Sequence, residues 1–314
     1  MAVKSELDQA TVSAAADTIR RGSKSFAAAA RLFAPAMRDD AVLLYAWCRH
    51  CDDVIDGQEL GHGAVPSSES SEDRLQHLRD ETARALDGRA TDPVFVAFGA
   101  LMRRRAIPAE LAYDHLDGFA MDVEGRRYTT LDDVLVYCYG VAGVVGLMMA
   151  HVMGVKDRSV LQRACDLGLA FQLTNIARDI VDDARVGRVY LPEDWLREAG
   201  IPLDELAEVH HRAALAGVAR RLVSAAEPYY ATANAGITAL PFRAAWAIAT
   251  ARGVYRAIGT EVVRRGPAAW DARVSTSKAD KLRHVLAGAA QAAGRRTPAM
   301  VDRAGLWTLP AGRA

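Results

Sequence analysis

The sequence predicts an all-α fold, a bundle of about ten or more helices, because apolar residues recur at three- and four-residue spacing through most of the chain. Residue pairs typical of helix starts precede several of these stretches. We find no convincing set of strands with alternating apolar and polar residues. In a bundle of this kind, side chains on facing helices can build a metal site in the core.

Helix-start signals and periodic stretches follow one another along the chain. Aspartate or threonine before an apolar run can cap a helix, and proline is favoured at its first position. The predicted starts and stretches, in chain order, are Asp92-Pro93, Pro108, the stretch from Thr130 to Gly154, and the alanine-rich runs Arg212 to Ala226 and Pro241 to Arg265.

An acidic cluster, Asp52-Asp53-Val54-Ile55-Asp56, follows an apolar segment early in the chain. Side chains four residues apart lie above one another on a helix, so Asp52 and Asp56 form a stripe of oxygen atoms on one face. Like charges so placed repel and cost a helix roughly 0.2 to 0.5 kcal/mol per pair. Taken alone, the cluster is more typical of a solvated helix end or a group of N-cap residues.

A second cluster, from Asn175 to Asp183, repeats the pattern, because Asn175, Asp179 and Asp183 continue one helical face. A cation between two such stripes would remove their repulsion. Mg²⁺ prefers oxygen ligands and is usually held by one or two carboxylates together with substrate phosphates. The two stripes together therefore predict a diphosphate bound through bridging metal ions. A third acidic region, Asp114 to Asp122, lacks a regular stripe, and we interpret it as lying behind the site or on the surface.

Two further groups of residues suit a charged, allylic ligand. Arg49 and Tyr45 share the helical face of the first stripe and offer a cation for diphosphate oxygens and a ring for an allylic cation. The alternative is an Arg–Asp pair within the helix, with Tyr45 in the core. Ser23 and Phe26 lie near a predicted helix start, which can hold phosphate. N-capping alone would also explain the serine.

Loops and a tail frame the predicted site. The segments from Gly57 to Ser71 and from Ala184 to Asp194 directly follow the two stripes, and we expect both at the mouth of the site. Proline and glycine in the last residues predict a loosely ordered tail. We therefore predict one domain, residues 1–294, followed by a tail, residues 295–314.

Two motifs suggest chemistry that their context does not support. Cys48 and Cys51 form a CxxC motif, but the chain has no second CxxC and no thioredoxin-like context of strand and helix. Gly140, Gly143 and Gly146 resemble a dinucleotide loop, yet they lie within a helical pattern. We interpret the cysteines as structural and the glycines as sites of close helix packing or as room for a bulky ligand.

Composition excludes several classes of protein. Lysine plus arginine and aspartate plus glutamate both total 39, so no overall field attracts nucleic acid. Four cysteines are too few for a secreted disulfide scaffold, and the first residues lack the layout of a signal peptide. We therefore expect a cytoplasmic protein. The longest apolar run, Val141 to Val155, is shorter than the about 20 residues of a membrane span and predicts a buried helix.

Three long composite motifs carry a family resemblance. They are Tyr45 to Asp53, Tyr137 to Gly143, and Gln172 to Asp183 followed by Gly187 to Pro192. In these segments the chain resembles the squalene/phytoene synthase family, and in particular its bacterial phytoene synthases. The similarity extends from about Ser23 to His284. It implies a class I isoprenoid synthase fold with a central apolar cavity.

The resemblance also implies an activity: head-to-head condensation of two geranylgeranyl diphosphates through a cyclopropyl (prephytoene) diphosphate to phytoene, the first committed carotenoid step. Matching positions imply metal ligation by Asp52, Asp56, Asn175, Asp179 and Asp183. Around the substrates they place Arg49, Gln172, Arg178, Arg188 and Tyr190, and along the substrate path Ser23, Phe26, Tyr45, Tyr137 and Tyr255. The residues expected to carry the chemistry are Asp52, Asp56, Asp179, Asp183, Arg49 and Tyr45. Family members often have glutamate where this chain has Asp182, a change that leaves the stripe intact.

By the same resemblance the cofactor is Mg²⁺, with Mn²⁺ as an alternative, and no NADPH is expected. The metal and the basic residues would assist loss of diphosphate, while an apolar cavity keeps water from the cation. The partners implied are two isoprenoid diphosphates, the membrane surface as a peripheral contact, and a downstream carotenoid desaturase that receives the product. The alternatives are dehydrosqualene or squalene synthase using farnesyl diphosphate, a terpene cyclase, and a non-catalytic isoprenoid-binding protein.

Overall fold

The computed structural model describes residues 15, 29–57, 69–294 and 301–313, and within them it contains helices and turns but no strand. The prediction of an all-α fold is confirmed. Ser23, Phe26 and residues 58–68 of the first predicted loop lie outside the described residues. In chain order the helices are α3 (Pro35–Asp56), α4 (Ser71–Leu86), α5 (Pro93–Arg105), α6 (Ala109–Val123), α7 (Leu131–Cys138), η1 (Tyr139–Gly143), α8 (Val144–Val152), α9 (Arg158–Arg185), α10 (Glu193–Glu198), η2 (Leu203–Glu205), η3 (Val209–His211), α11 (Arg212–Ile237), α12 (Phe242–Arg265), η4 (Gly266–Trp270) and α13 (Lys278–Gly294).

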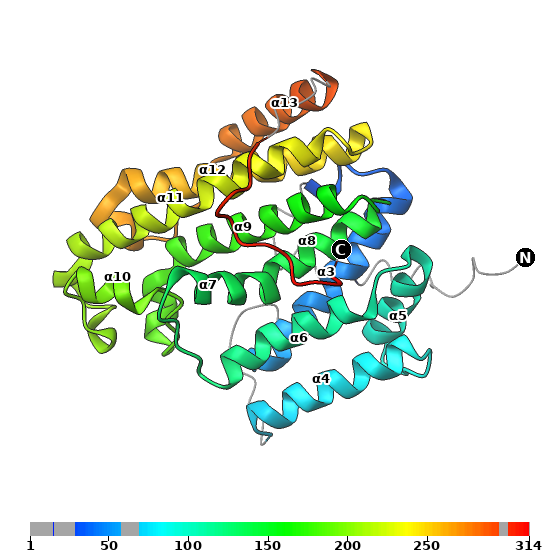
Figure 1. The fold of residues 1–314 in the computed structure, drawn as a ribbon, viewed down its shortest axis with the longest axis horizontal. Helices are drawn as coiled ribbons and strands as arrows, with labels where there is room; N and C mark the ends of the chain where they lie inside the picture. The colour runs from blue at the N-terminus through cyan, green and yellow to red at the C-terminus, as the bar shows by residue number, and fades with distance from the viewer. Residues whose placement is uncertain (1–14, 16–28, 58–68, 295–300, 314) are drawn as a thin grey trace, which may run out of the picture.

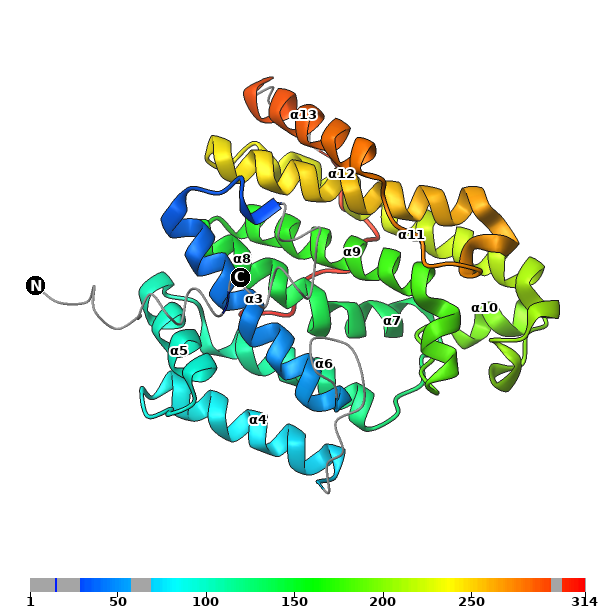
Figure 2. The ribbon, with the colours of Figure 1, turned by 180° about the vertical axis from the view of Figure 1, so that it is seen from behind.

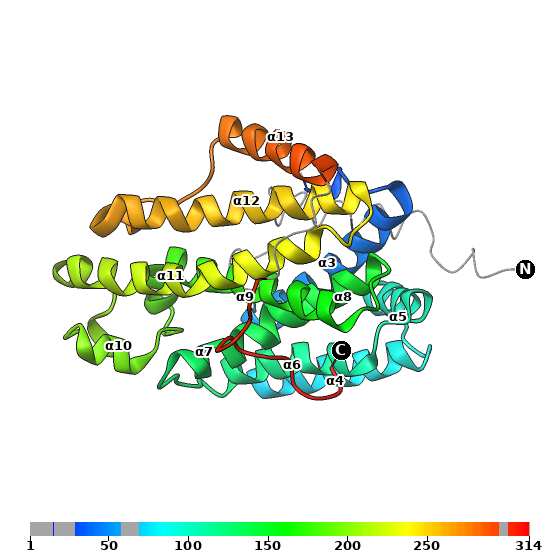
Figure 3. The same ribbon diagram turned by 45° about the horizontal axis from the view of Figure 1, so that its top comes forward.

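Helix α9 runs through the middle of the bundle and packs against α8, α11 and α12 (Figure 1). Figure 3 shows α12 and α13 on one side of this central layer and α4 and α6 on the other. Helix α3 runs beside α5 and α8, as the reverse view in Figure 2 shows. The two acidic stripes belong to α3 and α9, so the fold brings both into one bundle.

The predicted helix starts are confirmed by local capping. Asp92 caps α5, accepting a hydrogen bond from the amide of Val94 (2.8 Å), and Pro93 is the first helical residue. Helix α6 begins directly after Pro108. Thr130 caps α7 in a reciprocal capping box. These starts are set by neighbouring residues, so they could be predicted without knowledge of the fold.

Glycines bring the α7–η1–α8 element close to its neighbours. A Cβ atom on Gly140 would lie 2.7 Å from the Cα of Gly118 on α6, and one on Gly146 would lie 2.4 Å from the carbonyl oxygen of Ala164 on α9. Neither distance leaves room for a side chain. The interpretation of these glycines as sites of close helix packing is confirmed. The element also contains a π-helical turn, η1, which the apolar pattern did not reveal.

Among the described residues, one helical segment is long and apolar enough to cross a membrane by length and composition alone. It is Leu131–Val152, whose most apolar window has a mean hydropathy of 1.8. Of that window, 61% is buried inside the bundle. The burial matches the prediction that this apolar run forms a buried helix.

Residues 301–313 belong to the C-terminal tail that composition predicts for residues 295–314. They lie along the bundle and make specific contacts with α6, η1, α9 and α11. Two arginines in this segment, Arg303 and Arg313, form bidentate pairs with aspartates of α9 and α6. Proline and glycine therefore shape the path of this segment without leaving it unattached.

Candidate active site

A single cavity of about 370 Å³ passes between α3, α6, η1, α8, α9, α11 and α12. Most of its lining is apolar, and its polar residues come from α3, α6, α7, α9 and the segment that follows α9. Nine of the residues predicted from the sequence line it: Tyr45, Arg49, Asp52, Tyr137, Gln172, Asn175, Arg188, Tyr190 and Tyr255. The structure therefore collects side chains from distant parts of the chain around one space.

Other predicted residues lie next to the cavity and are not part of its lining. Asp56 reaches it indirectly through an ion pair with Arg188. Asp179 and Asp183 continue the face of α9 one and two turns beyond Asn175. The side chain of Arg178 turns to Asp179, to which its Nε donates a hydrogen bond of 2.8 Å.

On α3, one arginine holds the start of the first stripe. The Arg49 guanidinium pairs with Asp52 and lies 3.8 Å from a carboxylate oxygen of Asp53. This pairing is the alternative that the sequence left open for Arg49, but Tyr45 lines the cavity as well. Burial, together with the charges of Asp53 and Asp56, raises the pKa of Asp52 to about 6 despite the neighbouring Arg49. The positive charge near the first stripe is thus too small to keep the pKa of Asp52 at its usual value.

On α9, the three residues of the second stripe differ in their partners. Asp179 is paired with arginines, whereas, among the described residues, Asp183 and the side-chain oxygen of Asn175 are not. Burial opposes the ionisation of Asp179, but Arg178 and Arg273 outweigh it and hold its pKa below the usual value. Burial and the nearby Asp179 raise the pKa of Asp183 to about 7. The side-chain oxygen of Asn175 is buried and has no hydrogen-bond partner within the described part of the chain. An oxygen acceptor of this kind lacks a donor or a cation.

Arg188 lies between the two stripes. Its guanidinium pairs with Asp56 of the first stripe, and its charge lowers the pKa of both Asp52 and Asp183. Burial disfavours its charged form, yet the hydrogen bond to Asp56 and nearby acidic groups raise its pKa above the usual value. The segment after α9, predicted at the mouth of the site, therefore places a permanent cation between the carboxylates.

The end of the cavity lined by Arg49, Asp52, Asn175 and Arg188 is called the polar end here. Two stacked tyrosines and an aspartate also belong to it. The rings of Tyr137 and Tyr190 stack with centroids 4.6 Å apart. Their hydroxyls donate to Asp122, from Tyr190 at 2.7 Å and from Tyr137 at 3.2 Å. Burial raises the pKa of Asp122 to about 6, although the hydrogen bond from Tyr190 opposes the shift. Asp122 lines the cavity, so the interpretation of the region from Asp114 to Asp122 as lying behind the site or on the surface is wrong for this residue.

Beyond the polar end, the cavity continues between small and aromatic side chains. Phe171 and Tyr255 stack with centroids 4.2 Å apart and form part of the wall. Small residues of facing helices also line the cavity: Ala142, Gly146, Ala164, Gly168, Ala233 and Gly236. This shape suits a long apolar chain attached to a charged head.

Some residues of the site were missed from the sequence. Asp122 lies two helical turns after Asp114 on α6. The one sequence signal near it is Gly118, on the same helix face, which packs against Gly140. Arg273 lies in a loop and reaches Asp179 at 3.1 Å, across 94 residues of chain. Local spacing carries no signal for such a contact.

The CxxC cysteines are free thiols. Burial raises the pKa of Cys48 to about 12 and that of Cys51 well above its usual value, so both remain protonated at neutral pH. Cys51 is buried and Cys48 is half-buried, and protonated thiols are poor nucleophiles and poor metal ligands. Their structural interpretation agrees with this environment.

Comparison with known proteins identifies the family of this chain. The family model described as squalene/phytoene synthase matches residues 19–280. A phytoene synthase of Pseudescherichia vulneris is 54% identical over 307 residues, which cover 97% of this chain and 98% of the relative. A 15-cis-phytoene synthase of Enterobacter agglomerans is also 54% identical, over 92% of this chain and 99% of the relative. The chain belongs to the squalene/phytoene synthase family.

Solved structures with the same fold include a dehydrosqualene synthase in complex with a ligand. It superposes with a TM-score of 0.78 at 25% identity, covering 89% of this chain and 95% of that one. A squalene synthase, HpnC of Alicyclobacillus acidocaldarius, superposes with a TM-score of 0.72 at 22% identity, covering 82% and 94%. The predicted isoprenoid synthase fold is therefore confirmed.

Proposed function

We propose that this chain is a phytoene synthase, a prenyl transferase that joins two geranylgeranyl diphosphates head to head through a cyclopropyl diphosphate. The observation that carries the proposal is one cavity with a carboxylate- and arginine-rich end and a long apolar lumen. Relatives that bear the name phytoene synthase are 54% identical over nearly the whole chain. As proposed, the reaction belongs to the biosynthesis of carotenoids.

The residues at the polar end fit a divalent cation. The donors on both stripes are carboxylate and amide oxygens, which Mg²⁺ prefers. The buried oxygen of Asn175 has no partner within the described residues, and burial, reinforced by acidic neighbours, raises the pKa values of Asp52 and Asp183. We propose that Asp52 and Asp56 hold metal on one wall and Asn175, Asp179 and Asp183 on the other. When bound, Mg²⁺ (or Mn²⁺) supplies Lewis acidity toward the diphosphate.

The arginines of the site bind and orient the diphosphates. Arg49 and Arg188 line the cavity and, in the structure, pair with Asp52 and Asp56. Each guanidinium can donate two hydrogen bonds to phosphate oxygens. We expect them to shift from the carboxylates toward the substrate when the carboxylates bind metal. Gln172 and Tyr190, also in the lining, offer further donors. These contacts hold the leaving group in one position while the allylic carbon–oxygen bond breaks.

The apolar part of the cavity controls the cation that results. The rings of Tyr45, Phe171 and Tyr255 line this part and can stabilise positive charge on their faces. The surrounding apolar side chains keep water away from the allylic cation. The double bond of the second substrate can therefore attack the cation before water does. We propose that released diphosphate takes the final proton. Ser23 and Phe26, which lie outside the described residues, remain proposed contacts along the substrate path.

Product analysis tests this proposal directly. Purified protein is incubated with Mg²⁺ and either geranylgeranyl or farnesyl diphosphate, with and without NADPH, and the lipid extract is separated by chromatography. We expect phytoene from geranylgeranyl diphosphate regardless of NADPH. Dehydrosqualene or squalene formed only from farnesyl diphosphate would instead establish a dehydrosqualene or squalene synthase, the names that the similar solved structures carry. No release of diphosphate from either substrate would indicate a protein that only binds isoprenoids.

Peripheral membrane contact is proposed for the outer face of α13, because substrate and product are apolar. Leu282 and Leu286 lie one turn apart on this helix and are 59% and 63% exposed. Lys278 and Arg283 are exposed beside them, as expected for a helix that rests on anionic lipid. Sedimentation with anionic vesicles should decrease in the double variant Leu282→Ser/Leu286→Ser. Equal sedimentation of both proteins would exclude this surface. Such contact would also favour transfer of the product to a downstream carotenoid desaturase.

A further inference from the structure

Residues 301–313, here called the C-terminal strap, run along the outer side of the cavity walls. The strap crosses α9 and ends against α6, as Figures 1 and 3 show. It lies outside residues 19–280, the part of the chain that matches the family model. All the proposed metal ligands, by contrast, lie within residues 19–280.

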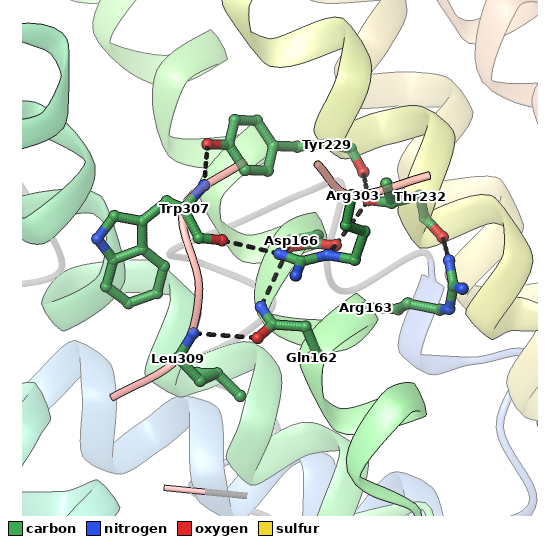
Figure 4. A network of polar contacts seen from close by, with 8 residues as sticks. All are labelled: Gln162, Arg163, Asp166, Tyr229, Thr232, Arg303, Trp307 and Leu309. Atoms are coloured by element: carbon green, nitrogen blue, oxygen red, sulfur yellow. Dashed lines mark hydrogen bonds and ion pairs between the residues drawn. The ribbon is translucent and has the colours of Figure 1, made fainter. Parts of the chain in front are cut away.

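The first anchor of the strap is a buried ion pair with α9 (Figure 4). Arg303 donates to both oxygens of Asp166, at 2.8 and 2.7 Å, and to the carbonyl oxygen of Trp307 at 2.8 Å. The Asp166 side chain is fully buried. It also accepts a hydrogen bond of 2.6 Å from Thr232 on α11. Arg303 is thus the only cation paired with this carboxylate among the described residues.

Backbone amides of the strap add two contacts that Figure 4 also shows. The amide of Trp307 donates to the hydroxyl of Tyr229 on α11 at 3.1 Å. The amide of Leu309 donates to the side chain of Gln162 on α9 at 3.0 Å. Leu309 itself is buried. The strap therefore follows a path fixed by both side-chain and backbone groups.

The second anchor joins the strap to α6 and to the π-helical turn η1. Arg313 donates to both oxygens of Asp114, at 2.7 and 3.0 Å. The hydroxyl of Tyr139, the first residue of η1, donates to the same carboxylate. The ring of Trp307 lies against the ring of Tyr139, with centroids 5.0 Å apart. Tyr139 is thereby held from two sides by the strap and its partner Asp114.

Each anchor on the bundle is next to a residue that faces the cavity. Asp114 precedes His115, Asp166 precedes Leu167, and Thr232 precedes Ala233, all of which line the cavity. Tyr139 begins the turn that contains Val141 and Ala142, which also line it. In addition, Arg163 lines the cavity and donates to the carbonyl oxygen of Thr232 at 3.0 Å. The strap and the lumen therefore lie on opposite sides of the same walls.

Buried ion pairs are weak evidence for stability, because well-packed apolar residues often do as well or better. What a bidentate arginine–aspartate pair does supply is a fixed geometry. We propose that the C-terminal strap positions η1 and α9, and that Arg303 and Arg313 thereby help to set the length of prenyl chain that the cavity accepts. They are positioning residues, since neither lines the cavity. The chain-length part of this inference rests on the proposed function.

The test compares substrates in matched variants. Arg313→Met removes the second anchor, and Arg313→Lys keeps its charge. The double variant Arg313→Met/Asp114→Asn removes the ion pair without leaving an unpaired carboxylate in the wall. The control is Arg256→Met, because Arg256 also makes a bidentate pair between helices, with Glu227, but both side chains are largely exposed (51% and 38%). Melting temperatures establish that each variant is folded.

We expect the ratio of kcat/KM for geranylgeranyl over farnesyl diphosphate to change by about fivefold in Arg313→Met and in the double variant. Arg313→Lys should recover part of the change, and Arg256→Met should keep the wild-type ratio. Arg303→Met should change the ratio in the same direction. A lower melting temperature with an unchanged ratio in the folded variants would overturn the proposal, because the strap would then only stabilise the fold.

Hydrogen exchange separates this inference from the proposed activity. In Arg313→Met, amides of residues 139–146 should exchange faster, whereas those of α4 and α5, to which the described residues of the strap make no hydrogen bond or ion pair, should be unaffected. Unchanged exchange over residues 139–146 would contradict positioning of η1 by the strap. If the wild-type protein forms no phytoene, the proposed function fails, and the exchange measurement still decides whether the strap holds this wall.

Discussion

Replacing Asp183 with asparagine should stabilise the metal-free protein at pH 8 and abolish its response to Mg²⁺. Burial and the neighbouring Asp179 raise the pKa of Asp183 from 3.8 to about 7. Between these two values the folded protein binds a proton that the unfolded chain does not. Stability therefore falls as pH rises through this window, and the full cost is present above about pH 7.

The magnitude follows from the size of that difference. At about 1.4 kcal/mol for each pH unit, keeping this carboxyl ionised above pH 7 costs the fold at most about 4 kcal/mol. Asp183 is partly exposed, so we expect about half of this, roughly 2 kcal/mol, after solvent screening. For a chain of this size that corresponds to about 4 °C in melting temperature. Asparagine has nearly the same shape and carries no charge, so the cost disappears.

The assay is thermal unfolding at pH 5 and pH 8, with EDTA or with Mg²⁺. Without metal, wild type should lose more stability than Asp183→Asn between the two pH values. With metal at pH 8, wild type should gain stability and the variant should not, since ligand binding to the folded state stabilises it. An Asp183→Asn protein that is less stable than wild type at pH 8 in EDTA would refute the reasoning. So would an equal response of both proteins to Mg²⁺.

Further predictions concern single groups of the site and its walls. Asp52→Ala or Asp179→Ala should lower kcat at least about a thousandfold, as expected on loss of a group that stabilises the leaving diphosphate, while circular dichroism remains that of wild type; retained turnover would argue against metal binding there. Arg188→Met should raise KM for the diphosphate, because the cation between the two stripes is lost, and a changed kcat with unchanged KM would assign it another role. Gly118→Ala should lower the melting temperature, because a Cβ would lie 2.8 Å from the backbone of Gly140 and overpacking costs about 1 to 3 kcal/mol. An unaffected melting temperature would show that α6 and η1 can move apart at little cost in free energy.

The parts of the site that could be predicted from sequence are those that depend on local periodicity. Asp52 and Asp56, like Asn175 and Asp179, share a helix face whatever surrounds the helix. The cap at Thr130 depends only on residues within the next turn. Such features need no knowledge of the fold, which explains why the stripes and several helix starts could be located in advance.

The parts that were missed depend on contacts between distant segments. Asp122 lines the cavity, where it accepts hydrogen bonds from hydroxyls of α7 and of the segment after α9. Arg303 and Arg313 meet their aspartates across 137 and 199 residues of chain. The π-helical turn at Tyr139–Gly143 leaves the apolar composition of its helix unchanged, so no periodic signal marks it.

The central claim is that stripes on α3 and α9 hold one diphosphate through divalent ions inside a shared cavity. A crystal structure with Mn²⁺ and a non-hydrolysable geranylgeranyl thiodiphosphate tests it most directly, because anomalous scattering locates the ions. We predict ions between the diphosphate and the oxygens of Asp52 and Asp56 on one side, and of Asn175, Asp179 and Asp183 on the other. Ions bound elsewhere, or a diphosphate held by arginines with no ion beside it, would contradict the claim.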